Sequence, residues 1–75
     1  MKYDLVGVDG NAFSVMRYTA RALKNEGLED LVDEMRNKAT SGDYNNLICV
    51  CLDYVTKANE AHEKKLSAGW DEEED

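Results

Sequence analysis

The hydrophobic positions of this chain change their spacing near residue 10, and the change predicts a short strand followed by helices. From residue 2 to residue 8 the side chains alternate between two faces, as they do in a β-strand. One face carries Tyr3 and Leu5, and the other carries Val6 and Val8. We therefore predict a strand over Lys2–Val8 that ends at the turn formed by Asp9 and Gly10.

A helical period follows this turn. Asn11 is a favourable N-cap residue, and the apolar residues after it recur along one stripe of a helix. These residues are Phe13, Met16, Ala20 and Leu23. The polar run from Asn25 to Gly27 ends the helix, with Gly27 as the expected C′ residue.

A second helix is predicted over Leu28–Ala39. Its early turns are acidic and its last turn is basic, an order that the helix dipole favours. Its apolar stripe consists of Leu28, Leu31, Val32 and Met35. A turn over residues 40–43 follows, in which Ser41 or Asp43 caps the next helix.

The third helix contains an apolar segment, Leu47–Leu52, whose periodicity alone does not separate a buried strand from a buried helix. Length favours a helix, because helical spacing continues over several turns and on to Lys65. From Ser67 we expect the helix to fray.

The predicted fold class is therefore α+β and mostly α, with one short N-terminal strand followed by three helices (β-α-α-α). Residues 1–68 form a single small helical domain, and residues 69–75 form an acidic, disordered tail. A lone strand is unstable, so it must pair with its copy in another subunit across a two-fold axis, or residues 47–52 must be a strand after all. A chain of this length buries only about 60 % of the surface that its unfolded form exposes, which also favours a homo-oligomer, at least a dimer.

The net charge of −7 comes mainly from the end of the chain. Residues 71–75 supply five of the sixteen acidic residues, so eleven acids face nine Lys and Arg in the remainder. A terminal acidic run is usually solvated and disordered. The alternatives are a decoy that imitates nucleic acid and a tether that occupies a basic groove. Direct binding of nucleic acid is not expected.

Few residues point to catalysis, to a metal or to a cofactor. Cys49 and Cys51 are too close in sequence to form a normal disulfide, and we expect reduced core thiols. His62, the single histidine, lies in a polar helical stretch and is expected at the surface. We predict a non-enzymatic protein without a metal site or cofactor. We found no secretory signal and no membrane-spanning segment, and therefore expect a cytoplasmic protein.

The most promising chemistry lies at the start of the first helix, where a strand turns through glycine into a helix and backbone N–H groups can bind an anion. A basic stripe of Arg17, Arg21 and Lys24 continues along this helix, and Tyr18 or Tyr44 could stack on a base. The predicted ligand-binding residues are Gly10, Asn11, Ala12, Phe13, Arg17, Arg21, Tyr18 and Tyr44. The alternative is that the glycine turn is a plain helix cap and that the cations pair with the acidic second helix or with a partner subunit.

Two motifs carry a resemblance to a known family. Residues 9–13 (DGNAF) open one helix and residues 41–47 (SGDYNNL) open another. As a pair they resemble a family of short uncharacterised phage and prophage proteins, with the likeness spanning about residues 4–55. The chain departs from this family after residue 55, where a long polar helix and an acidic tail replace a short apolar segment.

The resemblance implies a small phage-type accessory protein, and such proteins are often stoichiometric antagonists of host defence. In one mechanism the subunits enclose a nucleotide immune signal at the start of the first helix and at Arg17 and Arg21, and thus sequester it. In a second mechanism an acidic or helical face inhibits a host protein, for example by imitating nucleic acid. A structural or assembly adaptor is a third possibility. The sequence favours sequestration, because that mechanism uses the helix start, the basic stripe and the oligomer together.

Overall fold

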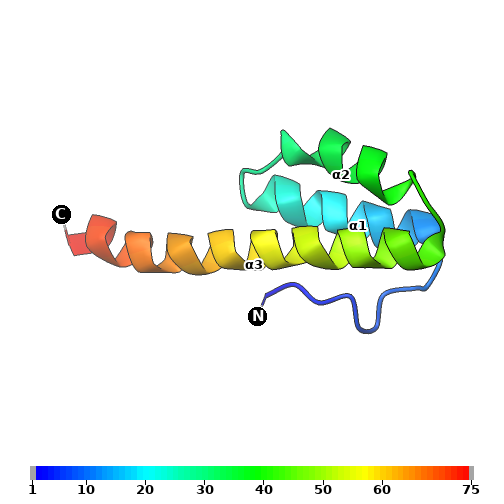
Figure 1. The fold of residues 1–75 in the computed structure, drawn as a ribbon. Helices are drawn as coiled ribbons and strands as arrows, with labels where there is room; N and C mark the ends of the chain where they lie inside the picture. Colours follow the sequence, from blue (N-terminus) through cyan, green and yellow to red (C-terminus); the bar gives the residue numbers. More distant parts are fainter. Residues whose placement is uncertain (1, 75) are drawn as a thin grey trace.

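The fold consists of three helices: α1 (Ala12–Asn25), α2 (Leu31–Ala39) and α3 (Tyr44–Glu74) (Figure 1). The structure is a computed structural model that describes residues 2–74 and the side chains of residues 2–65. α1 and α3 run in the same direction, and α2 runs back along α1. Each helix contacts both of the others, and the second half of α3 extends past the ends of α1 and α2 (Figure 1).

The described residues contain no β-strand, so the predicted β-α-α-α order is wrong in its first element. The predicted strand is interrupted by a turn. The Asp4 carboxylate accepts the Val6 N–H at 2.9 Å, and the Leu5 carbonyl accepts the Val8 N–H at 3.1 Å. Gly7 has a φ of 91°, which L side chains rarely adopt. The alternating apolar residues therefore lie on both sides of a turn and do not belong to one extended strand.

At the start of the chain, the backbone N–H and carbonyl groups form hydrogen bonds with side chains and not with a neighbouring strand. The Asn59 amide accepts the Tyr3 N–H at 2.8 Å and donates to the Tyr3 carbonyl at 2.9 Å. The Tyr18 hydroxyl accepts the Asp4 N–H at 2.9 Å. Because these bonds lie within one chain, the argument that a lone strand requires a second subunit no longer applies.

The ends of α1 lie where the sequence predicts them. The Asn11 side chain accepts the Phe13 N–H at 2.8 Å, as an N-cap does. At the other end Gly27 has a φ of 76°, and the Leu28 N–H donates to the Leu23 carbonyl at 2.8 Å. This pattern is a Schellman motif with Gly27 at C′, as predicted.

The Schellman motif also explains why α2 begins at Leu31 and not at the predicted Leu28. The Leu28 N–H is used to close α1, so residues 28–30 form the connection. At the start of α3 the Asp43 carboxylate accepts the Asn46 N–H at 2.9 Å, which identifies Asp43, rather than Ser41, as the cap.

Residues 47–52 are helical. The backbone of α3 continues to Glu74, past Ser67, from which we expected fraying and then an acidic tail. The side chains of residues 66–75, and thus the tail carboxylates, lie outside the described part.

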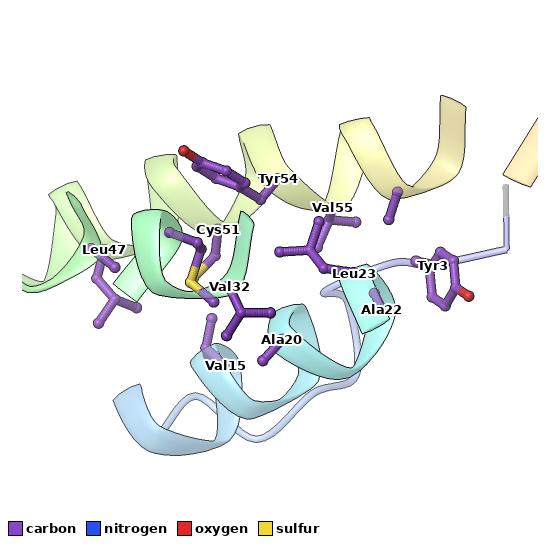
Figure 2. Close-up of a cluster of buried hydrophobic side chains, with 13 residues drawn as sticks. Tyr3, Val15, Ala20, Ala22, Leu23, Val32, Leu47, Cys51, Tyr54 and Val55 are labelled. Atoms are coloured by element: carbon purple, nitrogen blue, oxygen red, sulfur yellow. The ribbon is translucent and has the colours of Figure 1, made fainter. Parts of the chain in front are cut away.

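The core lies between the three helices and the segment that precedes α1 (Figure 2). Leu23, Met35, Thr19 and Cys51 are the largest fully buried side chains. Cys49 is exposed, because residues two apart on a helix point in different directions, so only one of the two expected core thiols is buried. Burial raises the pKa of the Cys51 thiol, although a hydrogen bond with Thr19 acts in the opposite direction.

Candidate functional site

A basic face covers the outer side of α1 and the adjoining part of α2. The inner side of α1 is buried through residues such as Val15 and Leu23. The opposite side carries exposed cations at helical spacing, and α2 adds one more. We define the basic face by these four residues: Arg17, Arg21, Lys24 and Arg36.

Two shallow pockets lie along the basic face. The first, of about 400 Å³, is lined by Val8, Ser14, Arg17, Tyr18 and Arg21. The second, of about 360 Å³, is lined by Arg17, Ala20, Arg21, Lys24, Asn25 and Arg36. Arg17 and Arg21 line both pockets. A molecule bound in either pocket can therefore contact both arginines.

The four cations of the basic face form no ion pair within residues 2–65. The ion pairs in this part of the chain lie elsewhere: Lys38 with Glu34 at 3.8 Å, and Lys65 with Glu26 at 3.3 Å. His62 Nδ1 also lies 3.3 Å from Glu26. Among the described side chains, the basic stripe therefore does not pair with the acidic second helix. Their charges face solvent, where they are available to an anion.

Tyr18 is fixed at the edge of the first pocket. Its hydroxyl accepts the Asp4 N–H at 2.9 Å, and the residue is partly buried against the core. The structure therefore brings Tyr18 together with Arg17 and Arg21, three of the predicted site residues. An aromatic ring beside two guanidinium groups offers both an apolar contact and anion-binding donors.

The start of α1, predicted as the anion site, is occupied by acceptors from the chain itself. The Asn11 side chain takes the Phe13 N–H, and the Asp9 carboxylate takes the Asn11 N–H at 3.2 Å. A carboxylate at this position repels a second anion. Gly10 has no positive φ, and a Cβ built on it would meet only the Tyr44 hydroxyl oxygen, at 3.5 Å. This turn is a helix cap, and its glycine needs no special backbone conformation.

The remaining predicted residues lie away from the two basic pockets. Tyr44 donates its hydroxyl hydrogen to the Gly10 carbonyl. Ala12, Phe13 and Tyr44 line a different, largely apolar groove at the end of the bundle. Phe13 also borders Arg17, so it lies between this groove and the basic face. Of the eight predicted residues, three thus line the basic pockets and three line this groove, while Gly10 and Asn11 belong to the cap of α1.

A second polar cluster, which the sequence did not indicate, surrounds the buried carboxylate of Glu26. Only 3 % of the Glu26 side chain is exposed, and it accepts a hydrogen bond from the Tyr3 hydroxyl. His62 Nδ1 and Lys65 Nζ approach its two oxygens, each at 3.3 Å. Burial by itself raises the pKa of Glu26, but the hydrogen bond from Tyr3 and the nearby ammonium group of Lys65 outweigh it and lower the pKa.

This cluster connects the segment that precedes α1 and the middle of α3 to the end of α1, so its role is structural. His62, expected at the surface, is only 25 % exposed, and its ring packs edge-on against Tyr3 at 6.4 Å between centroids. Glu26 lies in a polar run at the end of α1, and its partners are 23 or more residues away. No local pattern could have identified it.

Comparison of the chain with known protein families, with curated proteins and with solved structures finds no match. The described residues contain no group of acidic, His and Cys side chains arranged to hold a metal ion. Their helices also lack a stretch that is both long enough and apolar enough to cross a bilayer. The fold and the basic face define a small three-helix protein whose candidate function rests on its surface chemistry.

Proposed function

We propose that this protein binds a small anionic ligand, such as a nucleotide, on the basic face and holds it without chemical change. The observation that supports this proposal most directly is that Arg17 and Arg21 line two adjoining pockets and have no ion-pair partner within residues 2–65. In a chain with a net charge of −7, such a concentration of unpaired cations is a local exception.

The chemistry of the pockets fits a phosphate-bearing ligand. Arginine presents a planar fork of donors that matches phosphate, and two arginines one helical turn apart can bind one phosphate or two linked phosphates. Val8 and the Tyr18 ring add an apolar surface beside them. The volumes of about 400 and 360 Å³ fall in the range of small-molecule sites.

Binding without catalysis is proposed because the first pocket offers donors for an anion and no acid–base pair. Its only hydroxyl groups belong to Ser14 and Tyr18, and no carboxylate or imidazole lines it. Together with the resemblance to short phage proteins, this supports a stoichiometric role in which the protein sequesters a nucleotide immune signal of the host. Inhibition of a host protein through the acidic tail is the alternative, and it involves side chains outside the described part.

Native mass spectrometry with a panel of cyclic di- and trinucleotides and ADP-ribose compounds tests the proposal, followed by titration calorimetry. We expect one nucleotide to be retained in fixed ratio. Arg17→Ala with Arg21→Ala should weaken binding roughly 100-fold or more, since each lost charged hydrogen bond costs about 1.5–3 kcal/mol.

The matched control is Lys57→Ala with Lys64→Ala, which removes two exposed cations of α3 outside both pockets. This control should bind normally. Equal losses in the two double variants would indicate nonspecific attraction by charge. If the wild-type protein retains no compound, the proposal is wrong. The proposal is also wrong if deletion of residues 69–75 abolishes nucleotide retention while the double arginine variant keeps it.

A further inference from the structure

An apolar groove of about 380 Å³ lies at the end of the bundle where α1 begins, α2 ends and α3 begins. Met16, Ala39 and Leu47 contribute to its floor. Phe13 stands on its rim with 73 % of the residue exposed. A large aromatic side chain left in water beside an apolar groove is typical of an interaction surface.

Opposite charges flank this surface. Asp43 lies at the edge of the groove, at the start of α3. Phe13 and Met16 also border a second hollow, which is lined by Arg17 and Arg36. The surface therefore passes from an acidic edge, across apolar residues, to a basic edge.

We propose that this surface is the contact between two copies of the chain, related by a two-fold axis, with Phe13 of each copy inserted into the groove of the other. A two-fold contact requires a projection and a complementary hollow on one and the same patch. Phe13 and its adjoining groove meet that requirement. The same rotation places the acidic edge of one copy over the basic edge of the other, with Asp43 facing the partner subunit's Arg36.

A second copy fits this surface better than a lipid or an apolar peptide would. Those occupants could fill the groove, but neither carries charges that match both of its edges. A second copy turned by the two-fold rotation presents a basic edge to the acidic edge and an acidic edge to the basic one, at the same spacing. The surface shares Arg17 and Arg36 with the basic face. The inference does not rest on the proposed function, because Phe13 and Asp43 line neither of the two basic pockets. It also replaces strand pairing, which the fold excludes, as the mode of self-association.

Sedimentation velocity over a concentration series, with far-ultraviolet circular dichroism of each variant, tests the inference. We expect the wild-type protein to form a dimer. Phe13→Gln should raise the dissociation constant roughly thirtyfold or more, as loss of a central aromatic anchor does. It should keep the helical signal, because residue 13 contributes little to the core.

Val6→Gln is the matched control, because Val6 is 85 % exposed and lies outside the groove. It should leave the dimer intact. Asp43→Asn, which retains a capping side chain, and Arg36→Gln should each weaken the dimer and reduce its dependence on salt. A wild-type monomer at every concentration, a dimer that survives Phe13→Gln, or equal loss in Phe13→Gln and Val6→Gln would overturn the inference.

Discussion

At the scale of single residues, the least exposed charge among the described ion pairs is the carboxylate of Glu26, held by Tyr3, His62 and Lys65. A buried carboxylate is stable only when donors or positive charges surround it. Here those partners come from residue 3 and from the middle of α3, so one side chain connects three parts of the chain. The Asn59 amide binds the Tyr3 backbone close by and strengthens the same connection.

Tyr3→Phe should destabilise the protein by about 1.5–3 kcal/mol, the usual contribution of a hydrogen bond to a charged group. Phenylalanine fills the same space, so the loss isolates the hydroxyl. Urea unfolding followed by circular dichroism measures it. Tyr44→Phe, which removes an exposed hydroxyl bound to a neutral carbonyl, should cost clearly less. Equal losses in the two variants would show that Glu26 does not depend on Tyr3.

Asn59→Ala should free the segment that precedes α1. The Tyr3 N–H and carbonyl would both lose their partner, at a cost of about 1–3 kcal/mol for each group that stays buried. Amide hydrogen exchange should show the Tyr3 N–H exchanging much faster in the variant. Asn45→Ala, at an exposed position of α3, serves as the control. An unchanged exchange rate at Tyr3 would contradict the proposed bonds.

At the scale of elements, the connections determine how the helices pack. The Schellman motif at Gly27 reverses the chain after α1 and directs α2 back along it. α2 is then held against α3 by Tyr54, whose hydroxyl donates to Glu34. The Lys38 ammonium lies 5.8 Å from the centre of the Tyr54 ring and adds a cation–π contact.

Gly27→Ala should destabilise the fold by about 1–2 kcal/mol, because alanine at a φ of 76° places its Cβ against the backbone. Thermal unfolding measures the change. Gly10→Ala is the matched control, since Gly10 lacks a positive φ and a Cβ there has only an ordinary contact. We expect Gly10→Ala to be nearly neutral. The opposite order of the two effects would contradict the described backbone.

At the scale of the whole molecule, stability should depend on acidity through the Glu26 cluster. The pKa of Glu26 is lowered in the folded state, since its hydrogen bonds and positive neighbours outweigh its burial. Its contribution to stability is therefore present above the unfolded pKa of about 4.3 and is lost as pH falls through the folded pKa. Burial raises the pKa of Tyr3 and of Tyr54, so their contributions are lost as pH rises above about 10.

Glu26→Gln should therefore lower stability by about 1–2 kcal/mol at neutral pH, where the carboxylate is charged, and should have little effect at strongly acidic pH. Urea unfolding at several pH values measures the difference between the two proteins. Glu63→Gln, at an exposed position of α3, controls for the change in net charge. A difference that stays constant down to acidic pH would show that Glu26 is not the group that titrates.

Much of the helical part could be predicted from the sequence, because capping and periodicity are local. Asn11, Gly27 and Asp43 determine helix ends through bonds to residues at most five positions away. The error at the start of the chain has a local cause as well. Asp4 and Gly7 carry the signal of a turn, but the alternation of apolar residues outweighed that signal.

The candidate site was predictable only in part. The spacing of Arg17 and Arg21 places both on one side of α1, and sequence alone indicates that much. That Arg36 joins them, and that Ala12 and Tyr44 belong to another surface, depends on how the helices pack. Phe13 fitted the apolar stripe of its helix and yet is exposed, at the end of the bundle where α1 begins.

The sequence by itself determined three helices, most of their ends and the basic stripe of α1, because those features depend on residues within a few positions of one another. Only the tertiary structure decided that the first residues form no strand, that Glu26 is buried among distant partners and that two surfaces divide the predicted site. The physical reason is that burial and hydrogen bonding between distant residues follow from packing. Asn59 satisfies the Tyr3 backbone across 56 positions, and no local pattern contains that information.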